Sequence, residues 1–430
     1  MERRSSGLGM GRALLSVLAV IVLGVTGFAW WSTGLVVGGF NVSAALADPK
    51  FAKSTGGATN ILVMGLDTRK DQDGNQLPED VLAQLHAGDG NEGGYNTNTL
   101  ILVHVPADGK DIKAFSIPRD DYVRVSNIQG YTHAKIKEAY GLKKAEVEDQ
   151  LVAQGMTDRK EIETESREAA RKESIATVES LVGVPIDHFI EVSLVGFYDL
   201  AKALGGVEVC LKHRVHDSYS GANFPAGRQH LNASQALAFV RQRHGLDNGD
   251  LDRTHRQQAF IASVALSLQQ QGVFSNINQL RNMIAVAQKD IVISSGWDVE
   301  AFAQQIGDIA GTNLTFTTLP VKAYGVVDEQ DVNIIDPALI RATVQKAFGQ
   351  SIPDDGTYTD DDASSDVSPV AAAAALPGQT SAPHAASPTD SGSGSDSGSD
   401  SGSDSDSGSD SGPSPDAGSV VRGGQVPCVD

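Results

Sequence analysis

Six short apolar runs, separated by segments with helical spacing, constrain the fold of this chain more than any other feature. Each run is rich in β-branched residues and nearly continuously apolar, which is typical of strands covered on both faces. The runs are NILVMGLD at 60–67, TLILVHV at 99–105, DIKAFSI at 111–117, HFIEVSL at 188–194, VEVCL at 207–211 and LTFTTLP at 314–320. Helical spacing occupies 193–204, 234–242, 252–271 and 336–349. This alternation predicts an α/β fold within residues 57–351, a three-layer α-β-α sandwich around a mixed central sheet.

The N-terminal region predicts a membrane anchor. Residues 13–31 carry no charge, and as a helix they span about 28 Å, close to the hydrocarbon thickness of a bilayer. The preceding residues 1–12 contain Arg3, Arg4 and Arg12, which places this end in the cytoplasm by the positive-inside rule. A cleaved signal peptide is the alternative. With an anchor, 32–56 is an extracytoplasmic linker and the rest of the chain lies outside the cell membrane.

The C-terminal region predicts a disordered acidic tail over residues 352–424. It consists mostly of Asp, Ser, Gly, Ala and Pro, so it cannot bury enough apolar surface to offset the entropy of ordering. The formal net charge of −20 therefore belongs partly to this tail. An acidic chain outside the cell is also a poor partner for nucleic acid, whose phosphates it repels.

Two cysteines are present in the whole chain, Cys210 in a predicted strand and Cys428 in the C-terminal segment 425–430. In an oxidising exterior they can form a disulfide that pins the chain end to the folded domain across the tail. Two free thiols, one of them buried as a small apolar side chain, are the alternative.

Residues 143–174 are rich in Glu, Lys, Arg and Ala with scattered apolar positions. This composition predicts a charged helical arm inserted in the domain. We expect its charged face to be solvated and to keep the helix soluble.

Four arginines flank one glycine-containing loop in FVRQRHGLDNGDLDRTHRQQ, residues 239–258. Asp250 or Asp252 is a credible N-cap for the helix that follows, and Arg253, Arg256 and Gln257 share one face of its first turns. Cations oppose the positive end of a helix dipole unless an anion compensates them, and a phosphate or diphosphate does so well. The alternative is that nearby aspartates pair with these arginines on the surface. We expect Arg241 and Arg243, across the loop, to face the same cavity.

Charged side chains also follow two predicted strands. Asp67 and Arg69 end one apolar run, and Arg119 and Asp120 follow another. Ligands of open α/β sheets collect at the carboxyl ends of strands, so these groups predict the rim of an anion site. Carboxylate oxygens also suit Mg²⁺. The sequence has no GxSxG, HExxH or Walker glycine loop.

The order of these motifs resembles the LytR-CpsA-Psr family of bacterial cell-wall glycopolymer ligases, of the actinobacterial type. The resemblance covers about residues 60–266 without the charged arm. It rests on NILVMGLDTR, NTNTLILVHV, AFSIPRDDYV, HAKIKEAY, FIEVSLVGFYDLAKALGGVEV and LNASQALAFVRQR followed by GDLDRTHRQQ.

The resemblance implies a phosphotransferase that moves a glycopolymer from a polyprenyl-pyrophosphate carrier to peptidoglycan through a phosphodiester, with Mg²⁺ assisting. Arabinogalactan is one candidate polymer. The same resemblance assigns the diphosphate-binding set to Arg119, Lys135, Arg241, Arg243, Arg253 and Gln257. It assigns the metal to Asp67 and Asn98, and catalysis to Arg119, Asp67, Asp120, Arg241 and Arg243. Asp250 is a further, weaker assignment.

One departure from the family concerns its RSDTL segment, which is NTNTL at Asn96–Leu100 in this chain. Asn98 offers a neutral oxygen to Mg²⁺ in place of a carboxylate, and Asn96 lacks a guanidinium. We expect altered metal affinity, with Asp67, Asp89 or Glu92 compensating. Two other functions stay open: a polyprenyl-pyrophosphate hydrolase, and a non-catalytic binder of anionic wall polymer or lipid.

Overall fold

The computed structural model describes residues 40–87, 94–246, 249–273, 276–306, 314–349, 351, 368–369 and 420–430. The predicted membrane span at 13–31, most of the predicted tail, and Asp89 and Glu92 lie outside these ranges. Within them, no helix is both long and apolar enough to cross a membrane.

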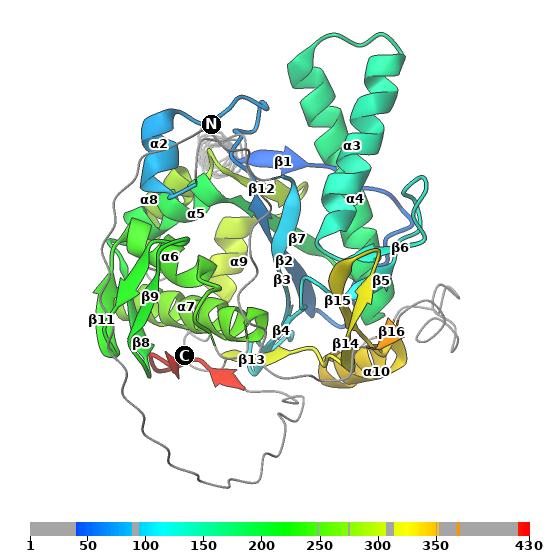
Figure 1. Cartoon of the computed structure of the whole chain (residues 1–430). Helices are drawn as coiled ribbons and strands as arrows, with labels where there is room; N and C mark the ends of the chain where they lie inside the picture. Colours follow the sequence, from blue (N-terminus) through cyan, green and yellow to red (C-terminus); the bar gives the residue numbers. More distant parts are fainter. Residues whose placement is uncertain are drawn as a thin grey trace, which may run out of the picture.

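The centre of the molecule is a mixed sheet of eight strands (Figure 1). In spatial order the strands are β1 (Asn41–Ser43), β12 (Ile291–Ser294), β7 (His188–Ser193), β2 (Thr59–Asp67), β3 (Asn96–Val105), β4 (Ile112–Ser116), β13 (Leu314–Thr318) and β17 (Val421–Arg422). The pairs β2–β7 and β4–β13 are parallel, whereas β3 runs antiparallel to both of its neighbours. Five of the six predicted strand runs lie in this sheet.

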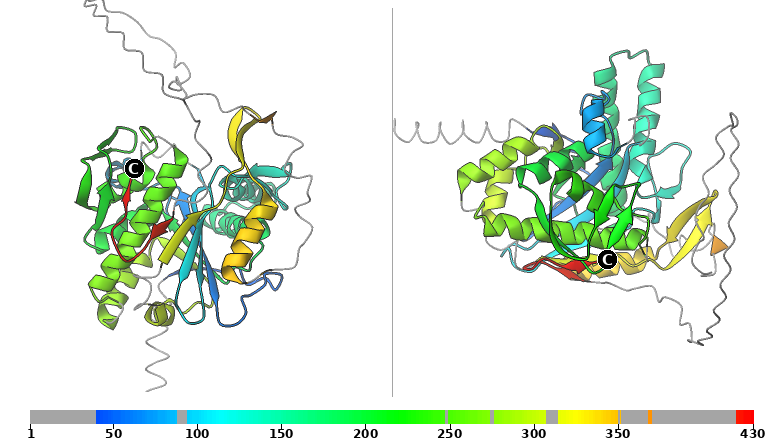
Figure 2. Two further views of the ribbon diagram at one scale, coloured as in Figure 1. Left: turned by 90° about the horizontal axis from the view of Figure 1, so that it is seen from below. Right: turned by 60° about the vertical axis from the view of Figure 1, so that its left-hand side comes forward.

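Helices cover both faces of the sheet, as predicted (Figures 1 and 2). One face packs against α3 (Glu138–Ala153), α4 (Arg159–Val182) and α10 (Pro337–Phe348). The other packs against α5 (Leu194–Ala203), α6 (Ala233–Arg241), α7 (Asp250–Gln270), α8 (Ile277–Ala287) and α9 (Val299–Ile306). The two faces divide β3 between them: Leu100 and Leu102 join the core beneath α4 and α10, whereas Ile101 joins the core beneath α7. This is the period of two that a doubly covered strand requires.

Smaller sheets surround this framework. They comprise β11 (Gly227–Leu231), β8 (Val207–Leu211) and β18 (Cys428–Val429); β9 (Val215–Asp217) and β10 (Ala222–Phe224); β5 (Tyr122–Arg124) and β6 (His133–Lys135); and β14 (Ala323–Val327), β15 (Gln330–Ile334) and β16 (Ser368–Pro369). A short helix, α2 (Glu79–Gln84), precedes the segment 88–93. The predicted strand at 207–211 thus forms, but in a side sheet.

Both ends of the described chain contribute to the folded body. Residues 41–43, which the sequence assigned to a linker, form the edge strand β1, because their backbone pairs with β12. At the other end β17 pairs with β13, and a disulfide joins Cys428 to Cys210 in the neighbouring strand β8. The predicted cysteine pairing is therefore present in the structure.

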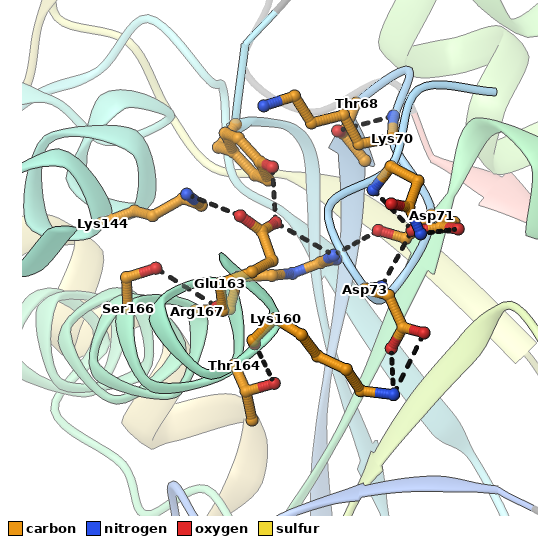
Figure 3. Close-up of polar contacts among 12 residues, drawn as sticks. Thr68, Lys70, Asp71, Asp73, Lys144, Lys160, Glu163, Thr164, Ser166 and Arg167 are labelled. Carbon is orange, nitrogen blue, oxygen red and sulfur yellow. Dashed lines mark hydrogen bonds and ion pairs between the residues drawn. The ribbon is translucent and has the colours of Figure 1, made fainter. Parts of the chain in front are cut away.

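The charged arm is a helical hairpin of α3 and α4 that projects beyond the sheet (Figure 1). The prediction of a solvated charged face is wrong for its base, where Lys144, Glu163, Arg167 and Arg171 are buried. Glu163 meets Lys144 at 2.9 Å and Arg167 at 3.6 Å, and Arg167 also donates to the main-chain oxygen of Asp71 (Figure 3). The amino-acid composition of the arm did not predict this burial, because each of these charged side chains has a buried partner.

Glu191 of β7 is the other anchor of the arm. It lies fully buried and accepts from Arg167 at 2.9 Å, from Arg171 at 2.8 Å and from the hydroxyl of Tyr140 at 3.1 Å. Burial by itself raises the pKa of Glu191, but the charges of Arg171 and Arg167 outweigh it and lower the pKa to about 2. This ionic cluster ties the arm to the sheet.

Candidate functional site

The candidate site lies at one edge of the central sheet, where β2 and β4 end and the antiparallel β3 begins. A β-bulge shapes this edge: Gly65 pairs with Thr99 and Leu66 pairs with Thr97, so Asn98 is the extra residue of β3. A side chain at Gly65 would not fit, because its Cβ would lie 2.9 Å from the Cβ of Thr99. Bulges re-aim side chains next to functional sites, and this one brings Asn98 to Asp67.

Asn98 connects the carboxylate of Asp67 with the guanidinium of Arg119. Its Nδ2 donates to Asp67 Oδ2 at 2.9 Å, and its Oδ1 accepts from Arg119 Nη1 at 2.8 Å. The other oxygen of Asp67 lies 3.4 Å from Arg69 Nη1. Sequence reasoning placed Asp67, Asn98 and Arg119 at the same edge, and the structure brings all three into contact.

Arg119 is surrounded by carboxylates. Its Nε lies 3.0 Å from Asp250 Oδ1 and 3.3 Å from Asp120 Oδ2. Asp120 also accepts from Lys137 Nζ at 2.5 Å. Burial raises the pKa of Asp120, but the charges and hydrogen bonds of Arg119 and Lys137 outweigh it and lower the pKa. Asp120 is therefore a weak base in this state.

The following residue, Asp121, belongs to the interior rather than to the site. It is fully buried and accepts from Asn333 Nδ2 at 3.0 Å, which attaches the β14–β15 hairpin to this loop. Burial raises the pKa of Asp121 well above its usual range. Asp121 thus supports the loop that presents Arg119 and Asp120.

The first turn of α7 contributes Asp250 and Arg253. Neither predicted aspartate caps this helix, because α7 begins at Asp250 itself and its N-cap is Gly249. Asp250 Oδ1 instead contacts Arg253 Nη2 at 2.7 Å as well as Arg119. Burial lowers the pKa of Arg253 to about 9, and its buried Nε has no hydrogen-bond partner within the described residues.

Arg241, the last residue of α6, and Arg243 flank this edge. Arg241 Nη1 donates to the main-chain oxygens of Leu85 and His86, at 2.9 and 3.2 Å. Arg243 is exposed, and the charges of Arg119, Asp250, Asp67 and Asp120 act on its guanidinium. Arg243 is thus open to solvent and lies close enough to these charged groups to interact with them.

Three assignments need correction or addition. Arg256 does not face the site, because it is fully buried and donates from Nη1 to Gln242 Oε1. Gln257 Nε2 lies 3.4 Å from the main-chain oxygen of Val240, behind the arginines. Lys137 was missed: it lies in the turn between β6 and α3, two residues after Lys135, whose own charge acts on Asp120. No strand or helix spacing relates the two lysines, so the sequence pattern contained no signal for it.

The charge balance favours an anionic ligand. Among the described residues, cations outnumber carboxylates at this edge: Arg69, Arg119, Lys135, Lys137, Arg241, Arg243 and Arg253 lie around Asp67, Asp120 and Asp250. Removing cations from water is costly unless anions compensate them. A diphosphate would supply that charge and the acceptors for guanidinium forks.

The donor set at Asp67 also suits Mg²⁺. This ion binds proteins through one or two carboxylates and takes its other ligands from water and substrate phosphates. The carboxylate of Asp67 is such a donor. The amide oxygen of Asn98 accepts from Arg119 while its Nδ2 faces Asp67, so this oxygen would reach a metal beside Asp67 only after the amide had turned over. No cluster of three or more His, Cys, Asp or Glu side chains able to hold a metal occurs in the described part of the chain.

Residues 40–347 match the sequence profile of the LytR_cpsA_psr family. The chain belongs to this family. The chain is similar to the cell wall biosynthesis protein LcpA of Corynebacterium glutamicum; the two are 39% identical over 373 residues, which cover 85% of this chain and 70% of LcpA. The polyisoprenyl-teichoic acid–peptidoglycan teichoic acid transferase TagU of Bacillus cereus is 28% identical over 230 residues, covering 52% of this chain and 65% of TagU.

Solved structures support the fold of this LytR_cpsA_psr member. Protein gbs0355 of Streptococcus agalactiae superposes with a TM-score of 0.50 at 18% identity, covering 68% of this chain and 89% of that protein. At this identity the likeness concerns the fold alone. It agrees with the predicted α/β sandwich.

Proposed function

We propose that the chain is a membrane-anchored, extracytoplasmic phosphotransferase that attaches a glycopolymer from a polyprenyl-pyrophosphate carrier to peptidoglycan through a phosphodiester. The observation that carries the proposal is the excess of partly desolvated guanidinium groups around Asp67, Asp120 and Asp250 at one sheet edge. Family membership supports the proposal, and so do the activities that the names of LcpA and TagU state for those relatives. The Cys210–Cys428 disulfide favours an oxidising, exterior location.

In the proposed reaction the arginines bind and orient the diphosphate of the donor. Arg119 and Arg253 are largely buried and both contact Asp250, whereas Arg243 would bind the diphosphate from the solvent-exposed side. Fixed donors aimed at transferring phosphoryl oxygens stabilise the charge that develops in the transition state, without reorganising at that moment. Breaking the bond to the carrier phosphate would leave polyprenyl phosphate, while the acceptor hydroxyl forms the new phosphodiester.

The acceptor hydroxyl must lose its proton, and Asp67 is the better base of the two predicted. Both oxygens of Asp120 already face cations and its pKa is lowered, whereas Asp67 Oδ2 faces only the neutral amide of Asn98. Asp67 and Asn98 are also the residues that would hold Mg²⁺. When bound, the ion would neutralise charge on the phosphates.

The test is transfer by the purified full chain, with a polyprenyl-pyrophosphate glycopolymer as donor and peptidoglycan fragments as acceptor. Arg119→Ala and Arg253→Ala should each lower phosphodiester formation by about two orders of magnitude, as loss of a transition-state donor does. Arg281→Ala is the matched control, because Arg281 is a partly exposed cation paired with Glu300. Unchanged transfer in the two site variants would contradict the assignment.

Two alternatives are separated in the same assay. Release of polymer phosphate in the absence of acceptor identifies a hydrolase. Tight donor binding without turnover identifies a non-catalytic binder, an alternative that Asn96 and Asn98 favour because the family's arginine and aspartate are missing there.

A further inference from the structure

The residue between the two site arginines, Gln242, points into the protein. It is fully buried, whereas Arg241 is half-buried and Arg243 is exposed. Arg241 is the last residue of α6, and the chain leaves the helix at Gln242, with φ −55° and ψ 136°. Because Gln242 lies between the two arginines, the contacts that hold it fix the stretch of backbone from which both side chains project.

Arg256 holds Gln242 from behind. Its Nη1 donates to Gln242 Oε1, and Gln242 Nε2 donates onward to the main-chain oxygen of His244 at 3.0 Å. The guanidinium also lies over the ring of Phe239, 5.4 Å from its centroid. Arg256 is itself fully buried, so its place depends on the groups that surround it.

One of those groups comes from the C-terminal segment, residues 420–430. Arg256 Nε donates to the main-chain oxygen of Asp430. The segment reaches this point by pairing β17 with β13 and β18 with β8, and it passes beside α7 (Figure 2). The disulfide to Cys210 fastens it, and Lys212 pairs with the Asp430 carboxylate at 2.8 Å.

We propose that segment 420–430 is a positioning element of the candidate site: through Asp430, Arg256 and Gln242 it orients Arg241 and Arg243 for diphosphate binding. The inference rests on the proposed function, since it assumes that these arginines bind diphosphate. The segment touches no substrate. It acts from behind the arginines, and the disulfide keeps it in place.

The experiment is calorimetric titration of the oxidised full chain with inorganic pyrophosphate. Two perturbations should each weaken binding by about tenfold, or about 1.4 kcal/mol. One is Arg256→Met, which keeps the length of the side chain but removes its donors. The other is reduction with dithiothreitol, which passes two electrons and two protons to the exposed Cys428 and its partner and becomes a cyclic disulfide. The reduced segment is then held by its non-covalent contacts alone.

Three controls separate positioning from loss of stability. Gln425→Ala changes an exposed side chain of the same segment that takes no part in the Asp430–Arg256–Gln242 contacts, and should leave affinity unchanged. Ile340→Ala destabilises the opposite core without touching the segment, and should also bind normally. The double variant Cys210→Ser with Cys428→Ser should bind weakly, with no further effect of dithiothreitol.

Three results would overturn the inference in different ways. If oxidised wild type binds pyrophosphate but Arg256→Met and the reduced protein bind equally well, positioning by the segment is wrong and the proposed function stands. If oxidised wild type does not bind pyrophosphate at all, both fail together. Weaker binding by Ile340→Ala to the same degree would also refute positioning, because instability alone would then account for the loss.

Discussion

Replacing Asn98 by aspartate tests how a negative charge at this position affects stability and the response to Mg²⁺ where β2 pairs with β3. Asn98 now donates to Asp67 at 2.9 Å and accepts from Arg119 at 2.8 Å. The variant Asn98→Asp keeps the acceptor for Arg119 but turns the first contact into two facing carboxylates. Without a metal the variant must be less stable than wild type, and with Mg²⁺ the added carboxylate becomes a ligand.

The size of the effect follows from the geometry. At an effective dielectric constant of about 40, suited to a pair that is partly exposed, two charges about 3 Å apart repel by about 3 kcal/mol. A stronger, charge-assisted bond to Arg119 offsets about 1 kcal/mol of this. The free energy of unfolding should therefore fall by about 2 kcal/mol, which lowers the melting temperature by several degrees.

The assay is thermal unfolding in EDTA and in excess Mg²⁺, with KCl matching the ionic strength. Asn98→Asp should melt below wild type in EDTA and gain more from Mg²⁺ than wild type does. Asn98→Ala is the control, because it removes the bridge without adding charge and should gain nothing extra. An Asn98→Asp variant that is as stable as wild type in EDTA, or that responds to Mg²⁺ no more than wild type, would refute the reasoning.

Three further predictions follow from named contacts. Arg167→Met leaves Glu191 and Glu163 short of a buried partner, so the free energy of unfolding should fall by about 3–5 kcal/mol in denaturant titrations; a loss below 1 kcal/mol would show that the cluster is not stabilising. Burial lowers the pKa of His104 from 6.5 to about 4. Between these two pH values the His104 side chain is neutral in the folded protein but takes up a proton in the unfolded chain. The contribution of His104 to the free energy of unfolding is therefore fully present above pH 6.5 and is lost as the pH falls from 6.5 to 4. His104→Gln should make the free energy of unfolding depend less on pH in this range, as measured by denaturation at several pH values. Tyr324 is 56% exposed and pairs in register with Asn333, whose amide donates to Asp121. If the proposed transfer is right, Tyr324→Ala should raise KM for the proposed acceptor about tenfold while KM for the donor stays constant, whereas equal changes in both would count against an acceptor role.

Local patterns predicted the parts of the site that lie on regular elements. Asp67 and Arg119 follow apolar strands whose ends meet at one sheet edge, and sequence alone was enough to place them together. The role of Asn98 as the extra residue of a bulge was not visible, because a bulge depends on how two strands pair.

Contacts between distant segments account for what the sequence did not predict. Arg256 shares a helical face with Arg253 in the sequence pattern, yet it is buried because residue 430 supplies an acceptor from the other end of the chain. The charges of the arm were expected in solvent for a similar reason: Glu191, which pairs with two of them, lies in a strand that periodicity marks as apolar. Helical periodicity is evaluated within one segment, so it cannot predict an ion-pair or hydrogen-bond partner that comes from a distant part of the chain.

The bond between Cys210 and Cys428 has a consequence for the integrity of the protein. In the sequence, the peptide bonds from residue 370 to residue 419 lie between strand β16 and the segment 420–430, which contacts Arg256. A protease that cut the chain anywhere in that interval would divide the backbone into two pieces, but the sulfur bridge would keep the shorter piece covalently attached. The nicked molecule would separate into two chains only after reduction.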